Sequence, residues 1–144
     1  MEKSFRRLTI DDYDAMRQVW DKAGLPYKPN GRESRTMLGA EISREHCAAF
    51  GVFDGATLVG LTLVNYDGRR GWINRLAVDP DYRRRGLGLQ VIRLCEAQFR
   101  GVGIEVWAAL IEDWNEASLA LFRKAGYHVH DHITYVSLRA RSDA

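Results

Sequence analysis

Three neighbouring arginines and two glycines stand between residues 79 and 88, where an apolar segment gives way to a helical pattern. Gly86 and Gly88 lack the side chains that keep a ligand away from the main chain, so successive N–H groups there can face an anion. The positive end of the following helix dipole strengthens this attraction. The sequence therefore predicts a phosphate-binding turn, and the row of N–H groups favours a ligand that contains a pyrophosphate.

Two other phosphate-binding patterns and a nucleic-acid site fit this segment less well. A Walker loop needs Gly-Lys-Ser/Thr, which is missing, and a dinucleotide fingerprint needs a third glycine where Val91 stands. Arg83, Arg84 and Arg85 resemble a nucleic-acid-binding patch. The whole chain, however, has 21 basic and 19 acidic residues and a formal net charge of +2. Three arginines in such a chain fit the rim of a local phosphate site better, and we expect no nucleic-acid partner.

A strand and a helix position this turn. Residues 72–78 are apolar and partly β-branched, which is typical of a buried strand. Ile92, Cys95 and Phe99 recur at spacings of three and four, which predicts an amphipathic helix from about Leu87 to Arg100. The turn therefore lies at the end of a strand and at the start of a helix.

A second strand and helix follow. Residues 104–110 have the pattern of a strand, and Asn115 is a good N-cap for the helix after it. Gly126 is placed for the left-handed residue that ends such a helix. The sequence therefore predicts a second strand followed by a helix after the first strand-turn-helix unit.

The turn resembles the acyl-coenzyme A loop of the GNAT superfamily of N-acetyltransferases. That loop is written Arg/Gln-x-x-Gly-x-Gly/Ala and is matched by Arg83, Gly86 and Gly88. In the same superfamily the later helix opens with Asn-x-x-Ala/Ser and ends in Gly-Phe/Tyr. The residues that match this second pattern are Asn115, Ser118, Gly126 and Tyr127.

The order of elements extends the resemblance over nearly the whole chain. We expect one α/β domain (α+β mixed sheet) of residues 1-144, with a mixed, mostly antiparallel sheet flanked by helices in the order β-α-α-β-β-β-α-β-α-β-β. Thr9 and Asp12 form a capping-box pattern for the first helix, which should end at Gly24. The expected elements are the strand 5–8, the helices 9–23 and 34–44, the strands 47–53, 57–65 and 72–78, the helix 87–100, the strand 104–110, the helix 115–126, and a closing hairpin of residues 127–129 and 133–138.

The resemblance implies acetyl-CoA (coenzyme A) as cosubstrate. Backbone amides from about Arg84 to Leu89 would bind the diphosphate, and the pantetheine arm would lie between the strands that end near Val78 and Leu110. Asn115 matches a residue that commonly contacts that arm, and it also suits the N-cap. The cofactor-binding residues implied in this way are Leu76, Ala77, Val78, Arg83, Arg84, Arg85, Gly86, Leu87, Gly88, Leu89, Asn115 and Phe122.

The sequence departs from the superfamily at the expected general acid. Seven residues after the Asn that opens the later helix, many members place a Tyr that can protonate the departing thiolate, and this chain has Phe122 there. A phenyl ring has no proton to donate. Tyr82, Tyr127 and Tyr135 are alternative candidates for this role.

The carboxylate that some members carry on the strand before the loop is also missing, because Trp72, Asn74 and Arg75 stand there. A general base must still take a proton from the ammonium group of the acceptor. Glu112 and Asp113 follow the second strand of the expected cleft and are candidates for this base. Proton transfer through water is the alternative.

The resemblance implies that the loop joining the first two helices forms the acceptor side, as it does in members of the superfamily. Tyr27 and Arg32 would suit an acceptor with an aromatic group or a carboxylate, whereas Glu33 would suit an amine. The acceptor therefore stays open between a small-molecule and a peptide amine. His128, His130 and His132 alternate and imitate a metal site, but no ligand from another element is evident and we expect no metal.

Composition agrees with one globular domain, because 46% of the 144 residues are hydrophobic. No segment approaches the ~20 apolar residues of a membrane span, and the N-terminus lacks a secretory pattern, so we expect a cytoplasmic protein with no membrane partner. Cys47 and Cys95 have the spacing of neither a metal site nor a disulfide framework. We predict an acetyl-CoA-dependent N-acetyltransferase, monomer or homodimer, that transfers its acetyl group directly. The alternative is a non-catalytic acyl-CoA-binding or regulatory module, which Phe122 and the missing carboxylate favour.

Overall fold

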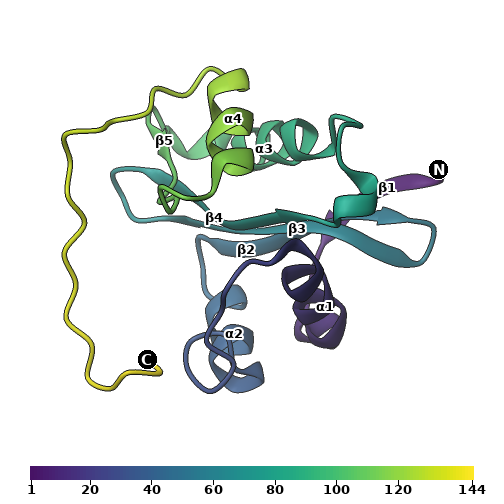
Figure 1. Ribbon diagram of the computed structural model, residues 1–144, viewed down its shortest axis with the longest axis horizontal. Coiled ribbons are helices and arrows are strands. Elements are labelled where there is room, and N and C mark those ends of the chain that lie inside the picture. Colours follow the sequence, from purple (N-terminus) through teal and green to yellow (C-terminus); the bar gives the residue numbers. More distant parts are fainter.

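The structure is a computed structural model that describes residues 1–144. Its centre is a 5-stranded sheet with the spatial order β1-β2-β3-β4-β5 (Figure 1). The first four strands pair antiparallel, and β5 joins β4 in parallel, so the sheet is mixed as predicted. The strands are β1 (Lys3–Arg7), β2 (Cys47–Asp54), β3 (Thr57–Tyr66), β4 (Gly71–Val78) and β5 (Trp107–Ala108).

Two helices cover each face of the sheet. Figure 1 shows α1 (Tyr13–Ala23) and α2 (Arg35–Ile42) below the sheet, and α3 (Leu87–Gln98) and α4 (Glu116–Lys124) above it. Each face carries its own buried apolar cluster. None of the helices has the length and apolar character that crossing a bilayer requires.

Local sequence signals set the ends of these helices. The predicted capping box forms, since the side chain of Thr9 accepts backbone N–H groups while Asp12 accepts the N–H of Thr9. Gly24 ends α1 at φ 70°, in the left-handed region that glycine adopts without strain. Asn115 accepts the N–H of Ser118 as the predicted N-cap of α4, at 3.2 Å.

A bulge interrupts β4 in the middle of its pairing with β3. Leu61 pairs with Ala77 and Leu63 pairs with Asn74, so two β4 residues, Arg75 and Leu76, face a single β3 residue. Arg75 has φ 56°, which is uncommon for a residue with a side chain. The bulge redirects the second half of β4, next to the edge where β5 lies.

The pairing between β4 and β5 ends early. Only Gly71 with Trp107 and Trp72 with Ala108 are in register, and the two strands then separate. The predicted strand 104–110 is therefore limited to two residues. Beyond Trp72, the outer edge of β4 has no strand partner. The carbonyls of Asn74 and Arg75 accept hydrogen bonds from the side chains of Thr62 and Trp20, and the outer edge from Leu76 to Val78 is left for a ligand.

The predicted closing hairpin is wrong for this structure. After Gly126 the chain leaves α4 and runs beside the body without strands, as the yellow segment of Figure 1 shows. We call residues 128–144 the tail. Ile133, Val136 and Leu138 are 69%, 84% and 99% exposed. An alternating pattern fixes which residues share a face but not which edge they pair with, and the two-residue β5 offers a very short edge.

Candidate active site

The turn after β4 is built by side-chain capping and by two left-handed residues. The side chain of Asp79 accepts the N–H of Asp81 at 2.9 Å and so caps a short 3-10 turn, Pro80–Tyr82. Arg84 at φ 65° and Gly86 at φ 74° then reverse the chain into α3. No side chain caps the start of α3. The first N–H groups of this helix therefore remain available to an anion.

The glycines of the turn differ in what surrounds them. A Cβ on Gly86 would meet no atom within 4 Å, so this position is open to a ligand and needs glycine for its backbone angle. A Cβ on Gly88 would lie 2.6 Å from a methyl carbon of Leu121. Gly88 therefore permits the close contact between α3 and α4, a packing role that the sequence pattern alone did not indicate.

The arginines of the turn are exposed, and one is engaged with a tyrosine. The guanidinium of Arg85 lies 4.9 Å from the ring centre of Tyr82. The Tyr82 hydroxyl donates to Asp54 at 2.7 Å, and this bond raises the tyrosine pKa. Tyr82 is therefore occupied in bracing the turn. Arg83 and Arg84 project from the surface beside the start of α3.

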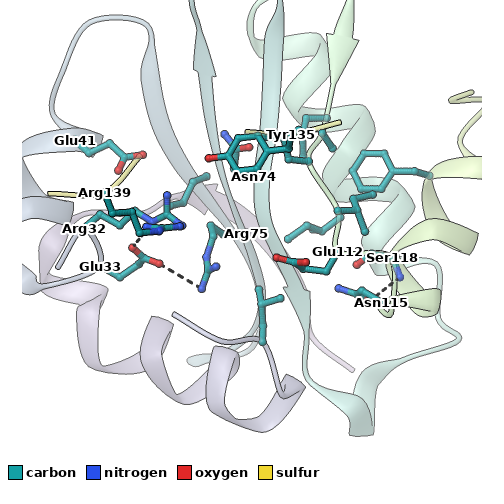
Figure 2. A pocket seen from close by; sticks show the side chains of 18 residues that line it. Arg32, Glu33, Glu41, Asn74, Arg75, Glu112, Asn115, Ser118, Tyr135 and Arg139 are labelled. Atoms are coloured by element: carbon teal, nitrogen blue, oxygen red, sulfur yellow. Dashed lines mark hydrogen bonds and ion pairs between the residues drawn. The ribbon is translucent and has the colours of Figure 1, made fainter. Parts of the chain in front are cut away.

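A pocket of about 450 Å³ opens where β4 and β5 separate. β4, the segment after β5, and α4 form one side of it, and the region around α2 together with the tail forms the other. Figure 2 shows Glu112, Asn115 and Ser118 on the first side, and Arg32, Glu33, Glu41 and Arg139 on the second. This volume lies within the ~300–1,000 Å³ of ordinary small-molecule sites.

The α4 side of the pocket combines an amide with an aromatic ring. Asn115 uses its side-chain oxygen as the cap of α4, which leaves its NH₂ group for a ligand. Phe122 is 3% exposed and packs edge-on against Tyr127, with ring centres 5.1 Å apart. Its ring therefore contributes an apolar surface beside the separated strands.

The structure separates the three predicted catalytic residues. Glu112 lines the pocket, and Asp113 does not. The Tyr127 hydroxyl donates to Glu96 on α3 at 2.6 Å and is not part of the lining. Burial and this carboxylate both raise the pKa of Tyr127. Of the tyrosines considered as proton donors, Tyr135 is the one that lines the pocket.

The predicted substrate-binding residues also divide. Tyr27 packs on Trp20 with ring centres 5.5 Å apart, its hydroxyl donates to Asp21 at 2.9 Å, and it does not line the pocket. Arg32 and Glu33 do line it. No group of His, Cys, Asp and Glu side chains is arranged to hold a metal ion.

Glu33 is the centre of a buried charged cluster. It is 2% exposed, and its carboxylate oxygens lie 3.5 Å from Arg75 and 3.3 Å from Arg32. Arg75 also donates to the carbonyl of Pro26, and its own carbonyl accepts the indole N–H of Trp20 at 3.2 Å. The cluster therefore ties the loop before α2 to the bulge of β4.

Sequence reasoning missed Glu41. This residue lies on α2 and lines the pocket, and burial followed by the charge of Glu33 raises the pKa of its carboxyl. The helix that carries Glu41 was predicted from residue 34. Which face of that helix meets the pocket depends on contacts with distant strands, which the local pattern does not contain.

Comparisons with known proteins agree with this arrangement. Residues 8–127 match the family model described as the acetyltransferase (GNAT) family. The uncharacterized N-acetyltransferase YfmK of Bacillus subtilis is 30% identical over 93 residues, which span 64% of this chain and 62% of that protein. The chain thus matches less than two thirds of the length of this relative. Acetyltransferase ECA0875 of Pectobacterium atrosepticum is 26% identical over 134 residues, 86% of each protein.

Solved structures share the fold at lower identity. The PaiA N-acetyltransferase of Thermoplasma acidophilum, in complex with coenzyme A, superposes with a TM-score of 0.81 at 20% identity, over 92% of this chain and 94% of that one. The aminoglycoside acetyltransferase AAC(6')-Iy, in complex with a bisubstrate analog, gives a TM-score of 0.79 at 15% identity, over 97% of this chain and 100% of that one.

Proposed function

The chain belongs to the acetyltransferase (GNAT) family, and from this premise we propose that it transfers an acetyl group from acetyl-coenzyme A directly to an amine. One observation carries the proposal. The outer edge of β4, which has no strand partner beyond Trp72 and ends at Val78, continues through the turn directly into the uncapped start of α3. An anion site beside a row of unpaired backbone groups suits a ligand with a pyrophosphate at one end and an amide arm at the other.

The residues of this chain fit such a ligand. The N–H groups at the start of α3, with Arg83 and Arg84 beside them, bind the pyrophosphate. The free edge of β4 from Leu76 to Val78 pairs with the amide arm, and the NH₂ group of Asn115 adds a donor. Acetyl-coenzyme A supplies the activated acetyl group, and Phe122 keeps water from one side of it.

Acetyltransferases that share this fold support an amine as the acceptor. The structures with the same fold include aminoglycoside acetyltransferases and a ribosomal-protein-alanine N-acetyltransferase. Those acceptors differ in size and charge, but each contains an amine. We call the α2 side of the pocket, with Arg32, Glu33 and Glu41, the acceptor end.

Glu112 serves as the general base. It lies across the pocket from the acceptor end and carries a carboxylate that can take a proton from the ammonium group of the acceptor, directly or through water (Figure 2). Tyr135 is the hydroxyl group of the pocket that can return a proton to the departing sulfur. Orientation of the two substrates and hydrogen bonds to the thioester oxygen supply the rest of the acceleration.

The experiment incubates the protein with acetyl-coenzyme A and each member of an amine library. Release of the coenzyme A thiol reports turnover, and mass spectrometry identifies the acetylated product. Glu112→Gln should lower kcat/KM by about 10²–10⁴-fold near neutral pH, with a smaller deficit at high pH, where the amine loses its proton unaided. Glu116→Gln, at an exposed α4 position outside the pocket, is the control and should change little. Tight coenzyme A binding without turnover of any amine would favour the non-catalytic binding module, which the Phe122 position also suggests.

A further inference from the structure

The backbone of the tail is held to the body at its two ends and makes no backbone–backbone hydrogen bond between them. Its last residues lie on the loop before α2, where Lys28 donates to the carbonyl of Ser142 at 3.2 Å and Arg141 to that of Asn30 at 3.5 Å. No residue from 128 to 140 makes a backbone–backbone hydrogen bond. Figure 1 shows the same course, from the end of α4 to the loop beside α2. The tail is thus a strap that spans the molecule.

Gly31 shows that the loop is shaped to receive the end of the tail. A Cβ at this position would overlap the main-chain carbonyl oxygen of Asp143. The φ of Gly31 lies outside the left-handed region, so its backbone conformation does not require glycine. The close approach of Asp143 is therefore the physical reason for glycine here, and even one methyl group should displace the tail.

The docked tail contributes two side chains to the pocket. Tyr135 and Arg139 both line it, although neither is near the other lining residues in sequence. Figure 2 shows Arg139 on the side of Arg32 and Glu33, and Tyr135 in front of Asn74. Anything that lifts the tail therefore removes part of the acceptor end and leaves the turn before α3 untouched.

Positive charge predominates at this end of the pocket. Glu33 is shared between Arg75 at 3.5 Å and Arg32 at 3.3 Å. Arg139 donates to a main-chain oxygen of Ala144 and pairs with no Asp or Glu side chain. Glu41 is the remaining carboxylate at this end, so three guanidinium groups, those of Arg32, Arg75 and Arg139, face two carboxylates. An anionic group on the acceptor would complete this arrangement.

We propose that the tail forms the outer wall of the acceptor end and selects amines that also carry a carboxylate, which Arg139 and Arg32 bind. This inference rests on the proposed function, because KM for an acceptor can be measured only if the protein transfers an acetyl group to it. Arg139 contacts the acceptor, Tyr135 keeps the role of proton donor proposed above, and Gly31 acts indirectly by permitting the tail to dock. The cofactor site does not depend on the tail.

The first test compares Gly31→Ala with Gly101→Ala. Gly101 also lies outside the left-handed region, and its Cβ would meet nothing within 4 Å, so this variant is a matched control. Gly31→Ala should speed trypsin cleavage at Arg139 and Arg141 and raise KM for the acceptor by about tenfold, with coenzyme A affinity unchanged. It should also lower kcat, because Tyr135 leaves the pocket with the tail. Cleavage and KM equal to those of Gly101→Ala would overturn the role of the tail.

The second test presents L-amino acids and their amides as paired acceptors. The amine of an amino acid amide is less basic than that of the free amino acid, so a larger fraction of it is unprotonated and reactive near neutral pH. Amine reactivity therefore favours the amides, and a preference for the acids must come from binding of the carboxylate. Wild-type protein should prefer the acids, and Arg139→Gln should reduce that preference by about tenfold. Arg100→Gln, outside the pocket, is the control. Equal use of both series, or an unchanged preference in Arg139→Gln, would overturn the proposed selection.

Failure of the reaction and failure of the inference are distinguishable. If the wild-type protein acetylates no amine although it binds coenzyme A, the proposed function is wrong. Calorimetric titration of the coenzyme A-loaded protein with the same acids and amides then decides the inference. If the wild-type protein binds the acids more tightly than the amides and Arg139→Gln abolishes this difference, the inference is supported. Equal affinity for acids and amides in the wild-type protein would contradict it.

Discussion

Replacing Gly86 with alanine isolates the backbone contribution to cofactor binding. The residue has φ 74°, and a Cβ there would meet no atom within 4 Å, so alanine adds strain without a clash. A left-handed residue with a side chain costs about 1–2 kcal/mol. If the turn keeps its shape, this cost lowers the free energy of unfolding, and Tm falls by about 3–7 °C for a chain of this length.

If the turn instead relaxes in the free protein, the cost is transferred to binding. Coenzyme A then has to restore the strained shape, and its affinity falls by about 5–30-fold, the equivalent of the same 1–2 kcal/mol. The two losses should therefore add up to about 1–2 kcal/mol whichever way the turn responds. Gly103→Ala is the control, because Gly103 has φ 79° and equally open surroundings outside the pocket.

Thermal unfolding and calorimetric titration of both variants measure the two terms. Gly103→Ala should lose stability only. The reasoning is refuted if Gly86→Ala loses neither stability nor affinity, or if Gly103→Ala weakens coenzyme A as much as Gly86→Ala does.

Three further substitutions test neighbouring conclusions. Tyr127→Phe removes the 2.6 Å hydrogen bond to Glu96 and should lower Tm by about 5 °C, the equivalent of about 1.5 kcal/mol, with kcat unchanged. A tenfold fall in kcat would show that the Tyr127 hydroxyl takes part in the reaction. Phe122→Tyr should leave kcat near the wild-type value, whereas a gain of about tenfold or more, about 1.4 kcal/mol of barrier, would show that a general acid is missing. Arg6 lowers the pKa of Asp12 below its ordinary 3.8, so Asp12 stabilises the fold above that pH and less as pH falls through its lowered value. Asp12→Asn should therefore be less stable than wild type in denaturant titrations at about pH 7, and the deficit should shrink as pH is lowered below 3.8. A deficit that does not change with pH would exclude the ion pair as its source.

The features predicted correctly from the sequence are local or belong to the family pattern. The capping box at Thr9, the N-cap at Asn115 and the left-handed Gly126 each depend on a few consecutive residues, and all three form. The family resemblance is confirmed by a match over residues 8–127. The order of elements through α4 and the mixed sheet are confirmed as well.

The features that escaped prediction depend on contacts between distant residues. The bulge that puts Arg75 in the left-handed region arises from its register with β3, and the packing role of Gly88 arises from Leu121 on another helix. Glu41 reaches the pocket only through the placement of α2. The tail has the alternation of a hairpin, but its partner along the chain is the loop around Gly31, which no periodic pattern identifies.

The order of the chain around the pocket has an evolutionary consequence. Residues proposed for the cofactor lie in one uninterrupted stretch, from Leu76 to Phe122. Most of the acceptor end comes from two outlying stretches, the loop and helix before β2 and the tail after α4. If the chain acts as proposed, mutation, insertion or recombination in either outlying stretch can change which amine is accepted while the central stretch is inherited intact. Homologues of this chain should accordingly diverge fastest at the two stretches that surround the acceptor.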